Sequence, residues 1–287
     1  MSAKTLSIIT VSYRCREAVG ALYQSLAVAG FLKRADVEVI LVDNRSEDGT
    51  VEEVRRRWPS VLVLPMESNG GFGFGCNAGS RIASAPILLF LNPDTQIEAR
   101  AIESMLEWIQ RHPQVAAVGP QLKHPSGSLQ ISCQRFPSVR LEALRQWAGL
   151  FGPIGLDERG DAHRVSRGPV DWVSGACMMV RAAAYEQVGP MDEGFFLYFE
   201  ETDWCLRARR CGYDIHHLPD IHVEHGAGVS AMSSGESLVH RRVEKHYVNS
   251  RRRFFRKHHG RCSEVLVESI HWSRRMVARL RGRRSNP

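Results

Sequence analysis

The sequence ILLFLNPDTQIE (residues 87–98) starts with five apolar residues and then turns polar at Asn92 and Asp94. A short run without a polar residue is typical of a strand that is buried on both faces of a parallel sheet. In open α/β sheets, ligands bind at the carboxyl ends of the strands. This stretch therefore predicts a central strand with a binding site at its end.

Strand and helix patterns alternate on both sides of this stretch. Further strands are expected at 6–13, 37–43, 61–64 and 115–120, and helices at 16–29, 50–58, up to about 84 and 98–112. Repeated strand–helix units predict an α/β fold, a Rossmann-like and mostly parallel sheet with helices on both faces. After Gln121 come short strand-like pieces, a loop-rich gap near 150–168, and helices expected at about 182–188 and 200–211.

The composition is that of an ordinary globular protein, with 43% hydrophobic and 24% charged residues. The seven cysteines show neither a C-x-x-C pair nor a zinc-type spacing, which favours a reducing compartment over a disulfide framework. The sequence shows no secretory leader and no run of about 18 apolar residues. We therefore expect a cytoplasmic protein without a membrane span.

The positive charge is concentrated at the C-terminal end. From Ser237 onward the chain has 15 Lys and Arg against 3 Glu, whereas the preceding residues carry a net charge of −5. A basic tail can meet nucleic acid, anionic lipid or only water. If residues 262–284 are helical, their mixture of apolar residues and arginines suits the inner face of an anionic membrane. The alternative is a solvated basic helix packed on the domain, and we expect nucleic acid least.

Polar residues and glycines follow the first four strands. Asp43 ends the second strand, the loop ESNGGFGFGCNAG (67–79) follows the third, and Asp94 follows the fourth. Glycines let backbone amides approach a ligand, ahead of a helix N-terminus that favours anions. These acids also have an alternative, purely structural interpretation, because Asp43 and Asp94 also suit turns. The loop segment GFGCNA (73–78) matches a dinucleotide fingerprint, although such glycines normally follow the first strand.

The second half contains a cluster of acids among aromatic residues. Glu200, Glu201 and Asp203 open an expected helix, and burial against aromatic neighbours would raise their pKa values toward those of a general base. The alternative is favourable charge at a helix N-terminus, with Asp203 paired to Arg207. His225 follows a strand-like segment, where a single histidine is more often structural than a ligand.

Six motifs in order make the chain recognisable from Leu6 to Ser230. They are SIITVSY, VILVDNRSEDGT, NGGFGFGCNAG, LLFLNPDT, the segment VSGACMMV to RRCGY (173–213), and HGAGVS. Together they resemble the family-2 glycosyltransferases of the GT-A fold, in the bacterial rhamnosyltransferase-like branch. The resemblance implies inverting transfer of a sugar, with rhamnose as one candidate, from a dTDP- or UDP-sugar. It further implies a glycan or lipid-linked glycan acceptor in cell-surface polysaccharide synthesis, and usually Mg²⁺ or Mn²⁺.

The resemblance also implies roles for individual residues. Asp94 and His225, supported by Asn92, would hold the metal, and Glu201 would be the catalytic base with Glu200 orienting the acceptor. The substrate-binding candidates are Thr10, Ser12, Asp43, Asn69, Gly70, Gly71, Asn77 and Asp203. Two residues depart from the pattern, because Asn92 replaces the first acid of a D-x-D element and Glu201 stands where Asp is more frequent.

We expect one GT-A domain over residues 1–235, followed by a basic helical extension over 236–287. Within the domain, residues 1–121 would bind the nucleotide and 122–235 the acceptor. The main rival function is a nucleotide-binding α/β oxidoreductase that uses the GFGCNA loop, and it should bind NAD(P) without a metal.

Overall fold

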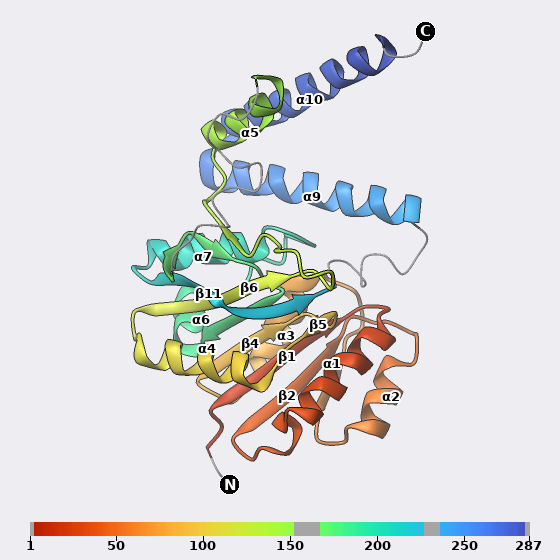
Figure 1. Ribbon diagram of the computed structural model, residues 1–287, viewed down its shortest axis with the longest axis vertical. Helices are drawn as coiled ribbons and strands as arrows, with labels where there is room; N and C mark the ends of the chain where they lie inside the picture. Colours follow the sequence, from red (N-terminus) through yellow and green to blue (C-terminus); the bar gives the residue numbers. More distant parts are fainter. Residues whose placement is uncertain (1–2, 152–166, 227–235, 285–287) are drawn as a thin grey trace.

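A mixed β-sheet forms the centre of the computed structural model, which describes residues 3–151, 167–226 and 236–284 (Figure 1). The strands are β1 (Leu6–Ser12), β2 (Val37–Asp43), β3 (Leu62–Pro65), β4 (Ile87–Leu91), β5 (Thr95–Gln96), β6 (Val115–Lys123), β7 (Cys133–Gln134), β8 (Gly168–Val170), β9 (Trp172–Val173), β10 (Cys177–Arg181) and β11 (Asp214–His225). The helices are α1 (Arg16–Val28), the short η1 (Phe31–Lys33), α2 (Thr50–Arg57), α3 (Phe72–Ile82), α4 (Ala99–Arg111), α5 (Val139–Phe151), α6 (Ala182–Val188), α7 (Glu200–Arg210), α9 (Glu236–His259) and α10 (Arg261–Arg284).

The strand order explains how distant segments meet. Within the described residues the main sheet runs β3-β2-β1-β4-β10-β6-β11-β5, and β8 pairs with β11. Strands β1 to β4 are parallel, as expected, and β6 and β11 are parallel to each other. Strand β10 lies antiparallel between β4 and β6. The two expected halves therefore share one sheet, and the boundary proposed at residue 121 falls inside β6.

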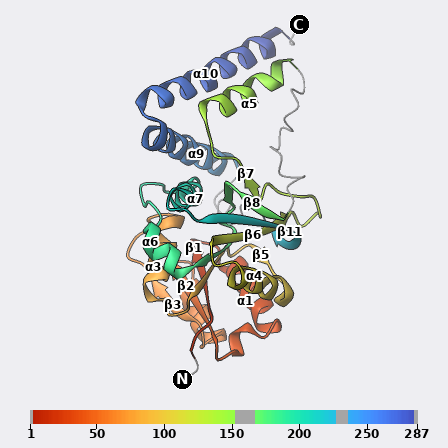
Figure 2. The same cartoon turned by 90° about the vertical axis from the view of Figure 1, so that its left-hand side faces the viewer.

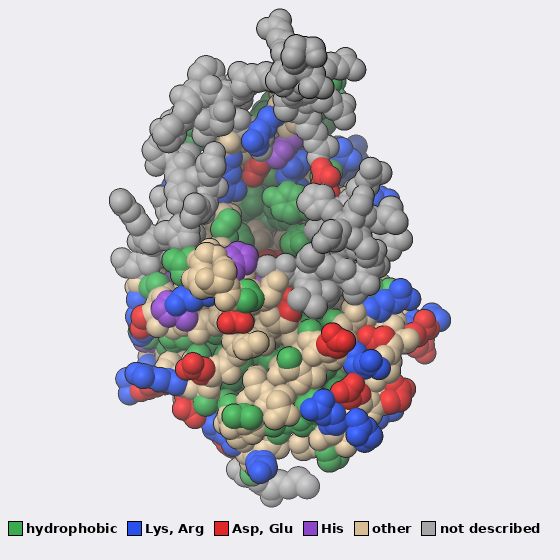
Figure 3. Space-filling view, turned by 45° about the vertical axis from the view of Figure 1, so that its right-hand side comes forward, with side chains coloured by type: hydrophobic (Ala, Val, Ile, Leu, Met, Phe, Trp, Pro, Cys, Tyr) green, Lys and Arg blue, Asp and Glu red, His purple; other side chains and the backbone are tan. Residues whose placement is uncertain are grey.

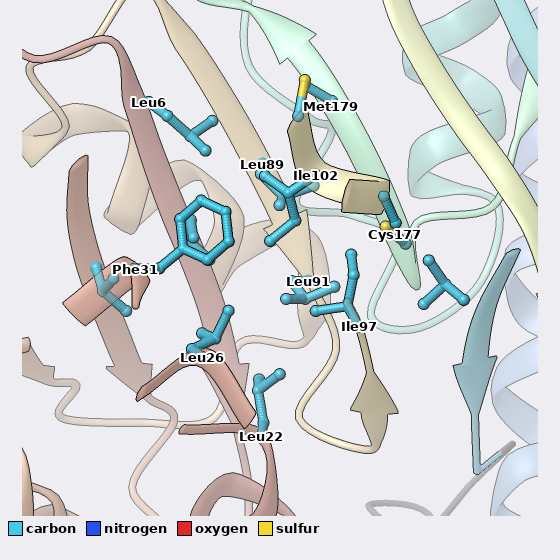
Figure 4. Packing of buried hydrophobic residues seen from close by; sticks show 14 of the residues in the cluster. Leu6, Leu22, Leu26, Phe31, Leu89, Leu91, Ile97, Ile102, Cys177 and Met179 are labelled. Carbon is cyan, nitrogen blue, oxygen red and sulfur yellow. The ribbon is translucent and has the colours of Figure 1, made fainter. Parts of the chain in front are cut away.

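The central strands are apolar throughout because both of their faces are buried. On β4, Leu89 and Leu91 belong to one core cluster, whereas Leu88 and Phe90 belong to the cluster on the opposite face. Figure 4 shows the first cluster, in which side chains from α1 and α4 pack against β1 and β4. Each fully buried Leu side chain contributes about 1.5–3 kcal/mol to the stability of the fold, relative to an exposed one. This two-sided burial is why the motif at 87–91 predicts a central strand.

Helices α5, α9 and α10 form a separate layer. Helices α9 and α10 are joined at Gly260, and α10 packs against both α9 and α5 (Figures 1 and 2). The basic helical extension is thus confirmed as helical over the described residues. We did not expect α5, because strand-like and loop-rich patterns flank it; the loop expected near 150–168 lies mostly outside the described residues. Nowhere in the described ranges is a helix both long and apolar enough to cross a bilayer.

Candidate active site

The ends of β1 and β2 place two of the expected residues side by side. Parallel pairing aligns Ser12 with Asp43, so their side chains lie on the same face of the sheet. The Ser12 hydroxyl donates to Asp43 Oδ1 at 2.7 Å, and the backbone amide of Ser46 donates to Asp43 Oδ2 at 2.9 Å. Thr10 lies two residues earlier on the same face and is fully buried. Asp43 is therefore held rigidly at the tip of β2.

The glycine-rich loop is anchored by Asn44, the residue that follows Asp43. Its side-chain amide donates to Gly71 O at 2.9 Å, and Asn69 Oδ1 accepts from the amide of Gly71 at 3.0 Å. Gly71 has φ +93°, and a Cβ there would lie 2.0 Å from the carbonyl oxygen of Phe196. Only glycine allows this close approach. The loop thus begins α3 directly against the segment that leads to the acids of α7.

Asn77 is buried and hydrogen-bonded within the protein, which differs from the expectation that it lines the nucleotide pocket. It is 1% exposed, and its side-chain amide donates to Met191 O at 2.9 Å and to Glu193. Its carbonyl oxygen accepts from the amide of Met191 at 2.9 Å and from the hydroxyl of Tyr185. Asn77 therefore joins α3 to the loop before α7, 114 residues away.

Asp94 and His225 converge, as the sequence predicts. Strand β5 pairs with the end of β11, opposing Thr95 to His225, and the amide of Gly226 donates to Asp94 O at 2.8 Å. As a result, Asp94 Oδ1 lies 3.4 Å from His225 Nε2, and Asn92 Nδ2 lies 3.4 Å from the same nitrogen. Residues 227–230 of the HGAGVS motif lie outside the described residues.

Gln130 orients this histidine, and no sequence pattern indicated it. Gln130 Nε2 donates to His225 O at 2.6 Å, which fixes the amide so that Oε1 accepts from His225 Nδ1 at 2.9 Å. With the proton on Nδ1, Nε2 presents its lone pair to Asp94. Metal-binding histidines commonly use their second nitrogen in this way.

The spacing of these groups fits one divalent cation. Adjacent ligands of an octahedral Mg²⁺ at about 2.1 Å lie about 3.0 Å apart, close to the 3.4 Å between Asp94 and His225. Among the described residues there is no cluster of three or more His, Cys, Asp or Glu side chains that could hold a metal. A cation here would therefore need ligands from water and from a bound phosphate, which is how proteins usually hold Mg²⁺.

Two adjacent buried acids open α7. Glu200 is 3% exposed, and one carboxylate oxygen of each of Glu200 and Glu201 is buried without a hydrogen-bond partner in the described residues. Burial raises the pKa of Glu200 well above its usual range, and the neighbouring Glu201 raises it further. Burial also raises the pKa of Glu201 to about 7. Burial thus favours the neutral form of Glu200, while Glu201 can accept a proton near neutral pH.

Asp203 is structural, which corrects its place among the substrate-binding candidates. Its side chain is fully buried; Oδ2 accepts from Arg207 at 2.9 Å, and Oδ1 accepts from Lys257 at 2.6 Å and from His258 at 2.7 Å. Burial raises the pKa of Asp203, but hydrogen bonds from His258 and Lys257 outweigh it, so the net shift is downward. The predicted pairing with Arg207 is confirmed, and the side chain has no exposed surface that a substrate could contact.

The turn Ser174–Ala176 connects the two chemical clusters. The carbonyl oxygen of Ala176 accepts from the amide of Asn92 at 2.9 Å, and a Cβ on Gly175 would lie 3.6 Å from Cβ of Glu201. The acids of α7 and the Asp94–His225 pair therefore flank one short turn. Figure 3 shows a hollow between the C-terminal helices and the sheet, with hydrophobic and charged side chains around it.

Most of the chain matches a known protein family. Residues 7–189, more than half of the chain, match the model of glycosyl transferase family 2. The chain belongs to glycosyl transferase family 2. The family-2 match spans β1 to β4 and the glycine-rich loop, and it ends just before the segment that carries the acids.

Individual relatives of this family-2 glycosyltransferase define its branch. It is 30% identical over 234 residues to N-acetylglucosaminyl-diphospho-decaprenol L-rhamnosyltransferase of Mycobacterium tuberculosis, covering 77% of this chain and 75% of the relative. It is 26% identical over 250 residues to dTDP-rhamnosyl transferase RfbF of Shigella flexneri, covering 84% and 79%. These similarities confirm the rhamnosyltransferase-like branch.

A solved structure supports the fold. The mannosyltransferase PcManGT from Pyrobaculum calidifontis, in complex with GDP-Man and Mn²⁺, superposes with a TM-score of 0.58 at 16% identity. The similarity covers 89% of this chain and 65% of that chain. It confirms the GT-A fold of the family-2 glycosyltransferase.

The oxidoreductase interpretation of the GFGCNA loop finds no support. The family-2 match includes this loop, and its glycines serve helix packing. A Cβ on Gly75 would lie 2.5 Å from Val11 Cγ1, and one on Gly73 would lie 3.4 Å from Cβ of Glu200. These glycines let α3 pack closely against β1 and against the start of α7.

Proposed function

We propose that this glycosyltransferase transfers a rhamnose-type sugar, with inversion, from a dTDP- or UDP-sugar to a glycan or lipid-linked glycan acceptor. The proposed process is cell-surface polysaccharide synthesis at the inner face of the cytoplasmic membrane. The names of the two rhamnosyltransferase relatives support the sugar, the donor and the acceptor class. The observation that carries the proposal is the convergence of Asp94 with His225.

The metal site would use three residues of this chain. Asp94 and His225 would hold Mg²⁺ or Mn²⁺, with Asn92 in support, and the cation would neutralise charge on the leaving diphosphate. Gln130 keeps the lone pair of His225 Nε2 turned toward Asp94. Asp43, Ser12 and the loop at Asn69–Gly71 would bind the nucleoside, where the N-terminus of α3 favours the negative diphosphate.

The two acids of α7 would have different roles toward the acceptor. Glu200, whose burial raises its pKa and favours the neutral carboxyl, can donate a hydrogen bond to the acceptor, whereas Glu201 can accept the proton of the acceptor hydroxyl. In the displacement, the bond from the acceptor oxygen to the anomeric carbon forms while the bond to the diphosphate oxygen breaks. The leaving group carries the electron pair away, and the proton ends on Glu201.

Binding measurements test the donor site directly. Titrations of UDP, dTDP and GDP, each with and without Mn²⁺, should show Mn²⁺-dependent binding of a pyrimidine diphosphate. A ligand at about 100 times its Kd adds about 2.7 kcal/mol of stability, which a thermal shift resolves. Asp94→Ala and His225→Ala should remove the Mn²⁺-dependent gain. Gln130→Leu should weaken it about 10–100-fold.

His222→Ala is the matched control, because His222 is an exposed histidine on the same strand. It should bind like the unchanged protein. If both Asp94→Ala and His225→Ala keep their Mn²⁺-dependent affinity, the metal site is refuted.

A further inference from the structure

One face of α9 packs against the segment that carries the candidate base. This inner face consists of His246, Tyr247, Ser250, Arg253, Phe254, Lys257 and His258. Their spacing of one, three and four residues puts them on one side of a helix. Each contacts the segment Asp192–Asp203, within which Glu200 and Glu201 lie.

Aromatic contacts hold the middle of this segment. The ring of Phe199 lies 5.4 Å from that of Tyr247 and 5.5 Å from that of Phe254, measured between centroids. Phe196 stacks on His246 at 4.4 Å. Phe199, immediately before the two acids, therefore rests on two aromatic residues of α9.

The backbone at this point needs such support. Tyr198 and Phe199 have φ values of 69° and 70°, in the left-handed region that residues other than glycine adopt only at an energetic cost. Such conformations persist when surrounding contacts hold them. Here the hydroxyl of Ser250 donates to Leu197 O at 2.9 Å, which fixes the peptide just before the strained pair.

Ion pairs pin both ends of the segment to α9. Lys257 Nζ lies 2.7 Å from Asp192 Oδ2 and 2.6 Å from Asp203 Oδ1, so one ammonium group bridges the two ends. Arg253 also binds Asp192, at 2.7 Å. A Cβ on Gly194 would lie 2.0 Å from Cζ of Arg253, so the guanidinium group packs directly on the backbone of the segment.

We propose that the inner face of α9 is a positioning element of the active site, because it fixes the segment Asp192–Asp203 and with it the carboxylate of Glu201. The proposal rests on the proposed function in taking Glu201 as the base. The family-2 match ends at residue 189, before both the segment and α9. The functional unit therefore extends past residue 235, where we placed the domain boundary.

Two neighbouring phenylalanines provide a matched test. Phe254 and Phe255 are both fully buried on α9, but the ring of Phe254 contacts Phe199, whereas that of Phe255 contacts Phe254 and His259. Phe254→Leu should lower kcat about 10–100-fold, because misplacing a catalytic group by about 1 Å costs about that much. The Kd for dTDP or UDP with Mn²⁺ should not change. Phe255→Leu should lower the Tm similarly and keep kcat within about twofold.

The pH dependence separates positioning from simple loss of stability. If the Glu201 carboxylate gains water in Phe254→Leu, its pKa falls and the acid limb of the kcat profile moves to lower pH. Ser250→Ala removes only the hydrogen bond to Leu197 O. It should also lower kcat, but by less than Phe254→Leu does. Equal losses of kcat in Phe254→Leu and Phe255→Leu, or a normal profile in Phe254→Leu, would overturn the proposal.

A measurement without turnover keeps this test independent of the donor. Carboxyl ¹³C resonances of labelled glutamates report the pKa of Glu201 directly, and Glu201→Gln identifies its signal. The pKa should fall in Phe254→Leu and stay unchanged in Phe255→Leu. An unchanged pKa in both refutes the positioning role of α9. Absence of transfer from any dTDP- or UDP-sugar, with this pKa pattern intact, counts only against the proposed function.

Discussion

The role proposed for Glu201 carries a cost in stability. A general base must be ionised yet basic, and burial provides this by raising its pKa to about 7. The unfolded chain has no such burial, so there the pKa is about 4.3. Because the folded pKa is the higher one, the folded state favours the protonated form. The associated stability is full below about pH 4 and is lost as pH rises through 7.

Replacing Glu201 with Gln separates the two effects. Glu201→Gln should reduce kcat by about 10²–10⁴ without changing donor binding, since the amide cannot accept the proton. It should raise the Tm at pH 8 and leave it nearly unchanged at pH 4.5, because only the ionised carboxylate is costly to bury. Kinetics and thermal unfolding at the two pH values measure this. If Glu201→Gln turns over normally and Glu200→Gln is inactive, Glu200 and not Glu201 is the base.

For single residues, the sequence could predict the position of those that lie at the ends of strands. Asp43 and Asp94 lie where parallel strands deliver them, because such strands end on one edge of the sheet. Asn77 and Asp203 were misassigned because their partners, Met191 and Lys257, come from segments far along the chain. Gln130 was missed for the same reason, since it lies 95 residues from His225.

Among the elements, α3 depends on a single glycine at its start. Gly71 precedes it with φ +93° and ψ −176°, a region that essentially only glycine adopts. Gly71→Ala should destabilise the protein by more than the ~1–2 kcal/mol of backbone strain alone, because the new Cβ meets Phe196 O. Binding of dTDP or UDP should weaken as well. Thermal unfolding and titration measure both effects.

Gly127→Ala is the control for this element, because Gly127 has a similar φ of +85° with nothing within 4 Å of its would-be Cβ. It should cost only the strain and leave nucleotide binding intact. Equal losses in the two variants would show that the contact of α3 with Phe196 is unimportant.

The order of elements was only partly predictable. Apolar runs gave β1, β2 and β4, and periodicity gave α6 at 182–188 and α7 from residue 200. The insertion of β10 between β4 and β6 has no local signature, because strand pairing depends on contacts between distant segments. Helix α5 was missed because it packs against α10, a helix at the other end of the chain.

At the scale of the whole molecule, α10 presents an uncovered apolar face. Val265, Leu266 and Trp272 are 64%, 50% and 65% exposed, and Met276 and Val277 are also exposed. The side chains of Arg275 and of residues 278–284 lie outside the described part. The chain from Ser237 onward carries a net charge of +12. Apolar residues on a strongly basic helix suit an anionic bilayer surface, which is the partner proposed for this face.

Flotation with vesicles tests this surface. The protein should float with vesicles of phosphatidylglycerol and phosphatidylethanolamine, and less so at high salt. Changing Val265, Leu266 and Trp272 together to Ser should weaken binding at least about 10-fold, through lost apolar burial. Val28→Ser, an 80% exposed apolar residue on α1, is the control and should float normally. Unchanged flotation of the triple variant, or a lipid-free dimer that the triple change disrupts, would contradict the membrane partner.

The place of β10 in the sheet also bears on how the chain folds as it leaves the ribosome. Strands β4 and β6 cannot complete their pairing until β10 has been synthesised. Strand β10 follows β6 by roughly 60 residues, and the ribosome needs about 3–12 s to add them at usual synthesis rates. During that interval both strands present open edges to other nascent chains. A ribosome that pauses between residues 123 and 177 would thus expose the chain to aggregation, so steady translation of this stretch favours a good yield of folded protein.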